Sequence, residues 1–298
     1  MILSFLVQRW HYHAMTETAA RSVDALRPSA ADALRAWAER VRANREQVDR
    51  FREASPADFY APVAGMFRAD PRRQDDPSLE ALRGLVRRTD TVLDIGAGGG
   101  RLALPLARET RQVIAIDPSE GMLRVLRAGM AEFHTGNIEV ISGRWPEVSA
   151  GIKADVALIS HIGYDVEDIG PFLDAMESAA RRLCVAVLLE QPPPTEADRL
   201  WPAVHGEARA ALPSLPEFLA LLLARGKIFE VQLVDRSPQS YGEPDQLLTW
   251  LRQQLWTTPD GPKDLRLQQV LRERLTERDG RYALSWDAVR VGVVTWHS

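Results

Sequence analysis

The sequence predicts an α/β protein with a doubly wound, mostly parallel sheet. Three observations support this fold class. Short apolar runs recur between residues 91 and 189, the stretches between them carry apolar residues at helical spacing, and a glycine-rich loop follows the first run. Continuous apolar runs are typical of strands that are buried on both faces. Their alternation with helices is typical of a parallel sheet covered by helices on each side.

About 90 residues precede the first predicted strand. Residues 31–53 form a predicted helix, because apolar side chains recur there at spacings of three and four: Leu34, Trp37, Val41, Val48 and Phe51. This narrow apolar stripe must pack on something, either on its own domain or in a lid or dimer contact. Residues 54–77 are rich in proline and predict loop and short turns, and 78–88 predict a short helix. Residues 1–14 are a candidate disordered lead.

Seven runs are strand candidates: 91–95, 112–116, 138–141, 155–159, 184–189, 229–234 and 289–295. Three consecutive prolines follow the fifth run, and residues 195–226 then predict helix. Within that stretch Ser214 and Glu217 have the spacing of a capping box. We therefore predict four parts: an N-terminal helical or lid segment (1–77), a Rossmann-like core (78–191), a helical cap insertion (192–227) and a segment that completes the core sheet (228–298).

Composition and charge narrow the class of protein. The chain has 298 residues and a net charge of −4, whereas a dedicated nucleic-acid binder usually carries a basic excess, so we expect no nucleic-acid partner. Cys184 is the only cysteine and lies in an apolar run, which predicts a buried strand residue. The N-terminal apolar run 2–7 is too short to span a bilayer. We expect a cytoplasmic protein without a membrane partner. The histidines lack metal-ligand spacing, so no metal is expected.

The glycine loop is the strongest chemical signal. The run Val92-Leu-Asp94-Ile-Gly96-Ala97-Gly98-Gly-Gly100 leads from a predicted strand into a predicted helix. Glycine permits a sharp turn and lets a ligand lie against bare backbone. The next strand ends in Asp117-Pro118, which places a carboxylate at the sheet edge where open α/β sheets bind ligands. Asp117 has the acceptors to bind both hydroxyls of a ribose.

This arrangement resembles motif I and the following acid of class I S-adenosylmethionine-dependent methyltransferases. Asp94, Gly96, Gly98 and Gly100 meet the family pattern acid-x-Gly-x-Gly-x-Gly in full. The resemblance covers roughly residues 85–195. It implies a seven-stranded sheet whose last strand is antiparallel, with S-adenosylmethionine above the first two strands. It also implies that the glycine loop, including Ala97, holds the methionyl end of the cofactor and that Asp117 holds its ribose.

The sequence departs from the family after the third strand. Many relatives carry an acid there that meets the adenine amino group, but this chain has Gly143, Arg144 and Trp145. Arginine cannot accept a hydrogen bond. We therefore expect backbone groups of Gly143 and Arg144 to contact adenine, with Trp145 packing on the ring or serving as plain core.

A nicotinamide dinucleotide fold is the rival interpretation, because Gly98-Gly-Gly100-Arg-Leu-Ala103 fits a loose G-x-G-x-x-A pattern. Asp94 within the turn favours S-adenosylmethionine, since a carboxylate repels a diphosphate and tolerates an ammonium or sulfonium. The long N-terminal segment and the final strand favour the same interpretation.

Groups near the methyl acceptor should follow the fourth predicted strand, at the same sheet edge. The resemblance places Ser160 and its neighbours by the cofactor sulfonium. His161 is a candidate general base, because its ordinary pKa lies near neutrality, and Tyr164 is a candidate pocket residue. Each has a structural alternative. Tyr60, Trp201 and His205 are substrate candidates, and helix packing is the alternative for them.

Three functions follow as hypotheses. The first is an enzyme that transfers the sulfonium methyl of S-adenosylmethionine by in-line displacement to a small-molecule acceptor. The second is an NAD(P)-dependent oxidoreductase. The third is a regulator or scaffold that binds S-adenosylmethionine without turnover. The acceptor atom is open, and a homodimer through the helix at 31–53 remains an alternative.

Overall fold

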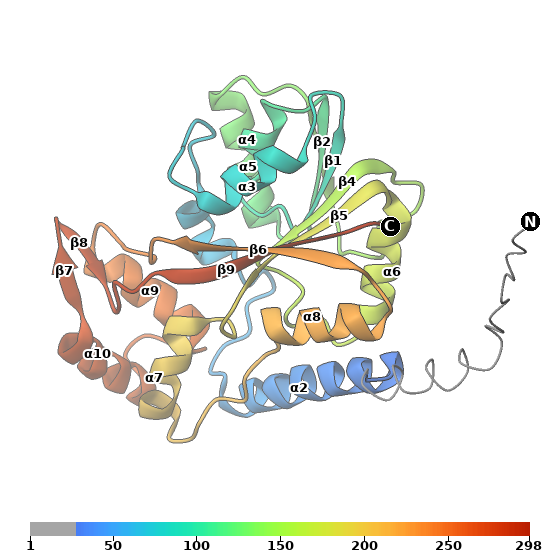
Figure 1. The fold of residues 1–298 in the computed structure, drawn as a ribbon. Helices are drawn as coiled ribbons and strands as arrows, with labels where there is room; N and C mark the ends of the chain where they lie inside the picture. Colours follow the sequence, from blue (N-terminus) through green and yellow to red (C-terminus); the bar gives the residue numbers. More distant parts are fainter. Residues whose placement is uncertain (1–27) are drawn as a thin grey trace, which may run out of the picture.

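The computed structural model describes residues 28–298, so the proposed lead of residues 1–14 lies outside the described part (Figure 1). Within residues 28–298 one seven-stranded sheet forms the centre of the molecule. Its strands are β1 (Thr91–Ile95), β2 (Gln112–Asp117), β3 (Ile138–Ser142), β4 (Ala154–Ser160), β5 (Ala180–Leu189), β6 (Phe229–Arg236) and β9 (Val289–Trp296). All seven strands were predicted from the apolar runs.

The strand order is β3-β2-β1-β4-β5-β9-β6. Strands β1 to β5 pair in parallel, whereas β9 pairs antiparallel with both β5 and β6. The α/β fold class and the antiparallel last strand are therefore confirmed. The chain order reverses between β1 and β4, and an open sheet of this kind binds ligands at the carboxyl ends of the strands beside such a reversal.

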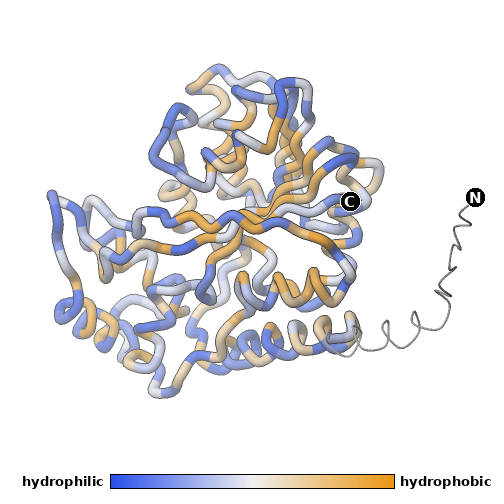
Figure 2. The backbone as a smooth tube through the Cα atoms, viewed as in Figure 1, coloured by the Kyte–Doolittle hydropathy of each residue, from blue (hydrophilic) through white to orange (hydrophobic). Residues whose placement is uncertain are grey.

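Helices cover both faces of the sheet. One face carries α3 (Pro77–Leu85), α4 (Ala103–Ala107) and α5 (Glu120–Glu132); the other carries α6 (Ile169–Ala179) and α8 (Leu215–Ala224). Successive strand residues serve opposite faces, so Val92 packs with the first group and Leu93 with the second, both fully buried. Figure 2 shows the hydrophobic residues concentrated along the central strands and α8.

A second helical group lies at one end of the molecule (Figure 1). It consists of α7 (Thr195–His205), α9 (Pro244–Gln254), α10 (Pro262–Arg274) and a hairpin of β7 (Thr276–Arg278) and β8 (Arg281–Ala283). We call this group the cap. Its core contains Trp201, Leu247 and Leu251 of α9, and Leu267 and Leu271 of α10. Because the cap segments are inserted after β5 and between β6 and β9, they lie beside the carboxyl ends of the parallel strands.

Residues 192–227 were predicted to be a single cap insertion, but the two helices in this segment pack on different parts of the molecule. Gly206, with φ of +86°, ends α7, and the chain then returns to the sheet. Helix α8 packs on the sheet through Phe218, Leu221 and Leu222, whereas α7 packs with α9 and α10. The predicted capping box at the start of α8 is present: the Glu217 side chain accepts the Ser214 backbone N–H at 2.9 Å.

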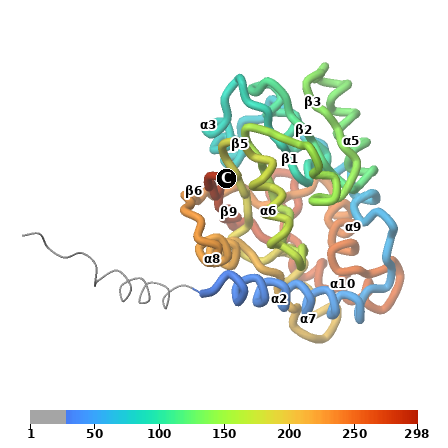
Figure 3. The backbone as a smooth tube through the Cα atoms, turned by 90° about the vertical axis from the view of Figure 1, so that its right-hand side faces the viewer, coloured from blue at the N-terminus to red at the C-terminus, as the bar shows by residue number. Residues whose placement is uncertain are grey.

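The helix predicted at 31–53 is α2 (Ala30–Phe51), and the turned view in Figure 3 shows it running along α8 and α6. Trp37 and Val41 are buried with the second face of the sheet, and Val48 is buried with the cap. The apolar stripe thus packs on its own chain, one of the two predicted alternatives. A dimer contact through this helix stays a prediction.

The segment between α2 and α3 is mostly irregular, as its prolines predicted, and contains one short 3-10 helix, η1 (Ala61–Phe67). Among the helices of residues 28–298, none is both long and apolar enough to cross a membrane. The cytoplasmic location, like the absence of a nucleic-acid partner, stays a prediction.

Candidate functional site

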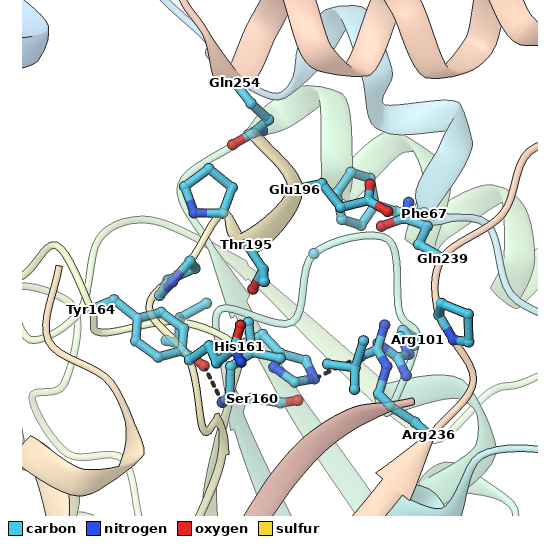
Figure 4. A pocket seen from close by; sticks show the side chains of 18 of the residues that line it. Phe67, Arg101, Ser160, His161, Tyr164, Thr195, Glu196, Arg236, Gln239 and Gln254 are labelled. Carbon is cyan, nitrogen blue, oxygen red and sulfur yellow. Dashed lines mark hydrogen bonds between the residues drawn. The ribbon is translucent and has the colours of Figure 1, made fainter. Parts of the chain in front are cut away.

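A cavity of about 650 Å³ lies between the carboxyl edge of the sheet and the cap. This volume falls in the range typical of small-molecule sites. Several segments line it. They are the glycine loop after β1, the segments that follow β2 and β4, the connection from β5 into α7, the end of β6, the start of β9, and parts of η1 and α9. Figure 4 shows side chains from several of these regions pointing into one space.

The glycine loop presents bare backbone to this cavity. Gly98 has φ of +55°, and a Cβ placed there would meet only the Met122 sulfur, at 3.9 Å. Gly100 also has positive φ, but a Cβ on it would lie 2.6 Å from Leu126 Cδ1, and Gly100 does not line the cavity. Gly96 and Ala97 line the cavity, and their N–H groups both donate to the Ile116 carbonyl. Gly98 is therefore the glycine that leaves room for a ligand, and Gly100 makes room for α5.

Asp117 lies at the end of β2, as predicted, and lines the cavity. Its Oδ2 accepts the Gly98 N–H at 2.8 Å, and its Oδ1 accepts the Ser119 N–H at 2.8 Å. Burial raises the pKa of Asp117, although these two backbone hydrogen bonds oppose the rise. Each carboxylate oxygen has a second lone-pair site. Asp117 is thus fixed by backbone and still able to accept hydrogen bonds from a sugar.

Asp94 is the most perturbed acid of the cavity. Burial, and after it the negative charge of Asp117, raise the pKa of Asp94 to about 7. Its Oδ2 is buried without a hydrogen-bond partner among the described residues. A buried carboxylate oxygen without a donor costs free energy, and a cationic ligand such as an ammonium group would relieve that cost. We call Asp94, Gly98 and Asp117 the acidic end of the cavity.

The acidic end fits S-adenosylmethionine. The bare backbone at Gly98 admits a flat or extended ligand, Asp117 offers acceptors for two hydroxyls, and the Oδ2 of Asp94 lacks a donor among the described residues. Two carboxylates in contact with one ligand are unfavourable for a diphosphate, because the charges repel. The same residues therefore fit a dinucleotide poorly.

The predicted adenine contacts are not found at the cavity wall. Gly143, Arg144, Trp145 and Pro118 do not line it. The Gly143 N–H donates to the Asp117 carbonyl at 3.1 Å. Trp145 is buried in the core, and its Nε1 donates to the Phe172 carbonyl at 3.1 Å. The prediction that Trp145 packs on adenine is wrong, because its indole points into α6; the alternative of plain core is the one observed.

Two arginines and a histidine form the other side of the cavity, where they lie close together in Figure 4. Arg236, at the end of β6, donates from Nη1 to His161 Nε2 at 3.1 Å. Arg101 follows the glycine loop and is ion-paired with Asp76 at 2.7 Å. We call Arg101, His161 and Arg236 the arginine end.

His161 is poorly suited to the predicted role of general base. Burial, and after it the charges of Arg236 and Arg101, lower the pKa of His161 to about 3. The Arg236 donor also occupies Nε2, so that nitrogen is the acceptor and the proton is on Nδ1. The φ of His161 is +56°, an uncommon conformation for a histidine, and its backbone N–H donates to the Val187 carbonyl at 2.9 Å. These contacts indicate that His161 orients Arg236.

The neighbouring candidates line the cavity as well. Ser160 lines it at the end of β4. Tyr164 lines it too, but its hydroxyl accepts the Leu189 N–H at 2.7 Å, and burial raises its pKa above the ordinary value. This hydrogen bond fixes the ring of Tyr164 in the cavity wall. Its catalytic role stays a prediction.

The three substrate candidates lie in different places, and only Tyr60 is at the cavity. Tyr60 lines the cavity and is 41% exposed. Trp201 is 0% exposed in the cap core, and its ring centroid lies 4.0 Å from that of His205. His205 Nε2 is 2.9 Å from the Leu255 carbonyl. Neither Trp201 nor His205 lines the cavity, so both predictions were wrong: the apolar face of α7 packs against α9 and α10.

Sequence reasoning missed several ionisable groups of the cavity, among them Arg236 and Glu196. Arg236 follows the sixth predicted strand. Asp117 was selected because it ends a strand at the ligand-binding edge of the sheet, and the same argument would have selected Arg236. Glu196 lies in the first turn of α7, and burial raises its pKa to about 7, against the effect of Arg199. No spacing pattern in the sequence indicates Glu196. Across residues 28–298, no three His, Cys, Asp or Glu side chains are grouped to hold a metal ion.

Comparisons with known proteins agree with this geometry. The sequence model of the methyltransferase domain family matches residues 92–182. A probable cobalt-precorrin-6B C(15)-methyltransferase (decarboxylating) of Methanobrevibacter smithii is 26% identical over 121 residues, which cover 38% of this chain and 65% of that protein. A ubiquinone biosynthesis O-methyltransferase of Azorhizobium caulinodans is 35% identical over 100 residues, or 33% of this chain and 37% of that protein. The chain thus spans less than two thirds of either relative.

Solved structures share the fold. A methyltransferase from Thiobacillus denitrificans, solved with S-adenosyl-L-homocysteine, has a TM-score of 0.50 and 19% identity, with 82% of this chain and 99% of that chain covered. The YcgJ protein from Bacillus subtilis has a TM-score of 0.51 and 17% identity, covering 74% and 97%. Residues 92–182 thus match the methyltransferase domain family, and the complete glycine motif, the sheet order and the shared fold agree with that match.

Proposed function

We propose that the protein is an S-adenosylmethionine-dependent methyltransferase that acts on a small molecule. The observation that carries the proposal is the acidic end, where a bare Gly98, a backbone-held Asp117 and an unpartnered Asp94 oxygen face one cavity. S-adenosylmethionine, when bound, supplies a methyl group on an already activated sulfonium. The remaining tasks of the protein are to align the two reactants and to exclude water.

The residues divide these tasks. Asp117 would accept hydrogen bonds from the ribose hydroxyls, and Asp94 would accept one from the methionyl ammonium. The cap forms one wall of the cavity, where Trp250 of α9 lines it together with Phe67 of η1. A cavity of about 650 Å³ suits a small-molecule acceptor. The two relatives from Methanobrevibacter smithii and Azorhizobium caulinodans are named for small-molecule pathways, which supports the same class.

We further propose Glu196 as the proton acceptor when the methyl acceptor loses a proton. A carboxyl group with a pKa of about 7 changes protonation near neutrality, which suits a general base. His161, with its pKa of about 3, would release a captured proton too readily to serve. The rate should therefore rise with pH through the pKa of Glu196, and Glu196→Gln should remove that rise while S-adenosylhomocysteine still binds.

Calorimetry and methyl transfer test the function. We expect S-adenosylhomocysteine to bind the wild-type protein and to stabilise it, and labelled methyl to appear in one member of a small-molecule panel. Gly98→Val should abolish the binding, because its side chain would fill the ligand space. Stabilisation by NAD(P) in place of S-adenosylhomocysteine would overturn the proposal in favour of an oxidoreductase. Tight S-adenosylhomocysteine binding without transfer to any acceptor would favour a regulator.

A further inference from the structure

We propose that the arginine end is a carboxylate-binding subsite for the methyl acceptor, with Arg236 as its principal ligand. The acceptor is then a small carboxylic acid with an apolar body. This inference rests on the proposed function, because it assigns the substrate class of the same cavity.

Arg236 has the opposite charge of Asp76 nearby but no direct carboxylate partner among the described residues. It forms no ion pair with a carboxylate of residues 28–298; its one side-chain hydrogen bond there goes to neutral His161. By contrast Arg290, on the adjacent strand β9, is neutralised by Asp235 at 2.9 Å. Burial, and after it repulsion from Arg101, lower the pKa of Arg236 to about 10, which still leaves it protonated at neutral pH. A partly buried guanidinium without a directly paired carboxylate is costly, and a bound anion would compensate it.

Asp76 offsets the positive charge of the arginine end only in part. Its charge raises the pKa of Arg236, but its carboxylate is already ion-paired with Arg101 at 2.7 Å and with Arg73 at 3.3 Å. His161 cannot offset the charge, because its lowered pKa keeps it neutral. The arginine end therefore attracts anions, and a guanidinium fork matches the two oxygens of a carboxylate.

The position of Arg236 points to the acceptor rather than to the cofactor. The groups that fit S-adenosylmethionine are on β1 and β2, whereas Arg236 ends β6 at the far edge of the sheet. The lining near the cap includes the apolar groups Phe67, Trp250 and Pro194 beside polar ones such as Glu196 and Gln254. A carboxylate at Arg236 would leave the remainder of the acceptor within reach of the apolar groups.

The test compares two probes of equal shape, benzoate and benzamide, by calorimetry on the full chain, with and without saturating S-adenosylhomocysteine. We expect wild-type protein to prefer benzoate, and Arg236→Met to lose that preference by about tenfold, the loss of one charge-assisted hydrogen bond. Arg236→Lys should retain part of it. Arg42→Met, which removes an exposed arginine ion-paired with Glu167 on the outside of the molecule, should retain all of it. Equal binding of the two probes, or an unchanged preference in Arg236→Met, would overturn the proposal.

A second arm separates the acceptor from the methionyl carboxylate of the cofactor. Binding of S-adenosylhomocysteine and of 5′-methylthioadenosine, which lacks that carboxylate, is measured for wild type and Arg236→Met. We expect both affinities to be unchanged, which also shows that the variant folds. Selective loss of S-adenosylhomocysteine binding would assign Arg236 to the cofactor and overturn the inference. Failure of wild type to bind either nucleoside would overturn the proposed function alone, because the benzoate preference without nucleoside is scored separately.

Discussion

The two ends of the cavity differ in how the chain builds them. The acidic end comes from adjacent strands β1 and β2 and the loop between them, and backbone N–H groups hold Asp117 in place. The arginine end joins residues that follow β1, β4 and β6, and its side chains contact one another. The region matched by the methyltransferase domain family, residues 92–182, contains the whole acidic end but not Arg236. The difference teaches that local sequence builds the acidic end, whereas the arginine end is completed by Arg236 from outside the matched region.

At the acidic end, the largest expected effect is the one that protonation of Asp94 has on stability. Its pKa is about 7 in the folded protein and near the ordinary 3.8 when unfolded. Because the pKa of Asp94 is raised by folding, its contribution to the unfolding free energy is fully present at pH values below the pKa of the unfolded chain. This contribution is lost as the pH rises toward 7. Between pH 4 and pH 8 the ligand-free wild type should lose up to about 4 kcal/mol more unfolding free energy than Asp94→Asn. Denaturant titration at several pH values measures this; parallel curves for the two proteins would contradict a buried, titrating Asp94.

Nucleoside affinity is the next largest effect and sharpens the comparison directly. Asp117→Ala should weaken S-adenosylhomocysteine binding about 100-fold, because two charge-assisted hydrogen bonds to ribose are lost. Arg236→Met serves as the matched variant from the other end and should bind normally. Calorimetry at constant ionic strength gives both values. Equal losses in the two variants would mean that the ends are not separate in function.

His161 tests the arginine end with a smaller effect. His161→Asn keeps a residue type that tolerates positive φ and removes the imidazole that accepts from Arg236. We expect a loss of turnover of about tenfold at most, with the pH dependence near neutrality unchanged, because a group with a pKa of about 3 does not titrate there. Disappearance of the pH dependence would restore His161 as the base in place of Glu196.

Substitution of Trp145 has the smallest expected effect and tests whether this residue belongs to the acidic end. Trp145→Phe loses the hydrogen bond from Nε1 to the Phe172 carbonyl and should lower the unfolding free energy by about 1 kcal/mol. The affinity for S-adenosylhomocysteine should not change. A clear loss of affinity at normal stability would return Trp145 to the adenine site.

Local patterns predicted the sheet and the acidic end well. Each strand was visible as an apolar run, and the order glycine loop, helix, strand and Asp117 fixed the position of that carboxylate relative to the loop. Both depend on neighbours in sequence. The same reasoning identified the capping box of α8, because its partners Ser214 and Glu217 are three residues apart.

Side-chain destinations across the fold were not predictable. Trp145 follows a strand that ends near the cofactor edge, yet its indole turns toward α6. Trp201 and His205 are amphipathic residues that follow the cavity-lining segment in the sequence. They pack instead in the cap core with α9 and α10. Glu196 gains its raised pKa from burial that only the assembled cap creates. In each case the deciding neighbour is distant in the chain.

Helix α2 has a mechanical consequence for access to the cavity. With 22 residues it is about 33 Å long, and one end is anchored in the sheet core through Trp37 while the other reaches the cap through Val48. A helix of this length acts as a brace between the sheet core and the cap. Wide swinging of the cap would require unpacking one of the anchors, so reactants should enter by small displacements of the η1 segment, where Tyr60 is exposed, while the braced frame stays in place.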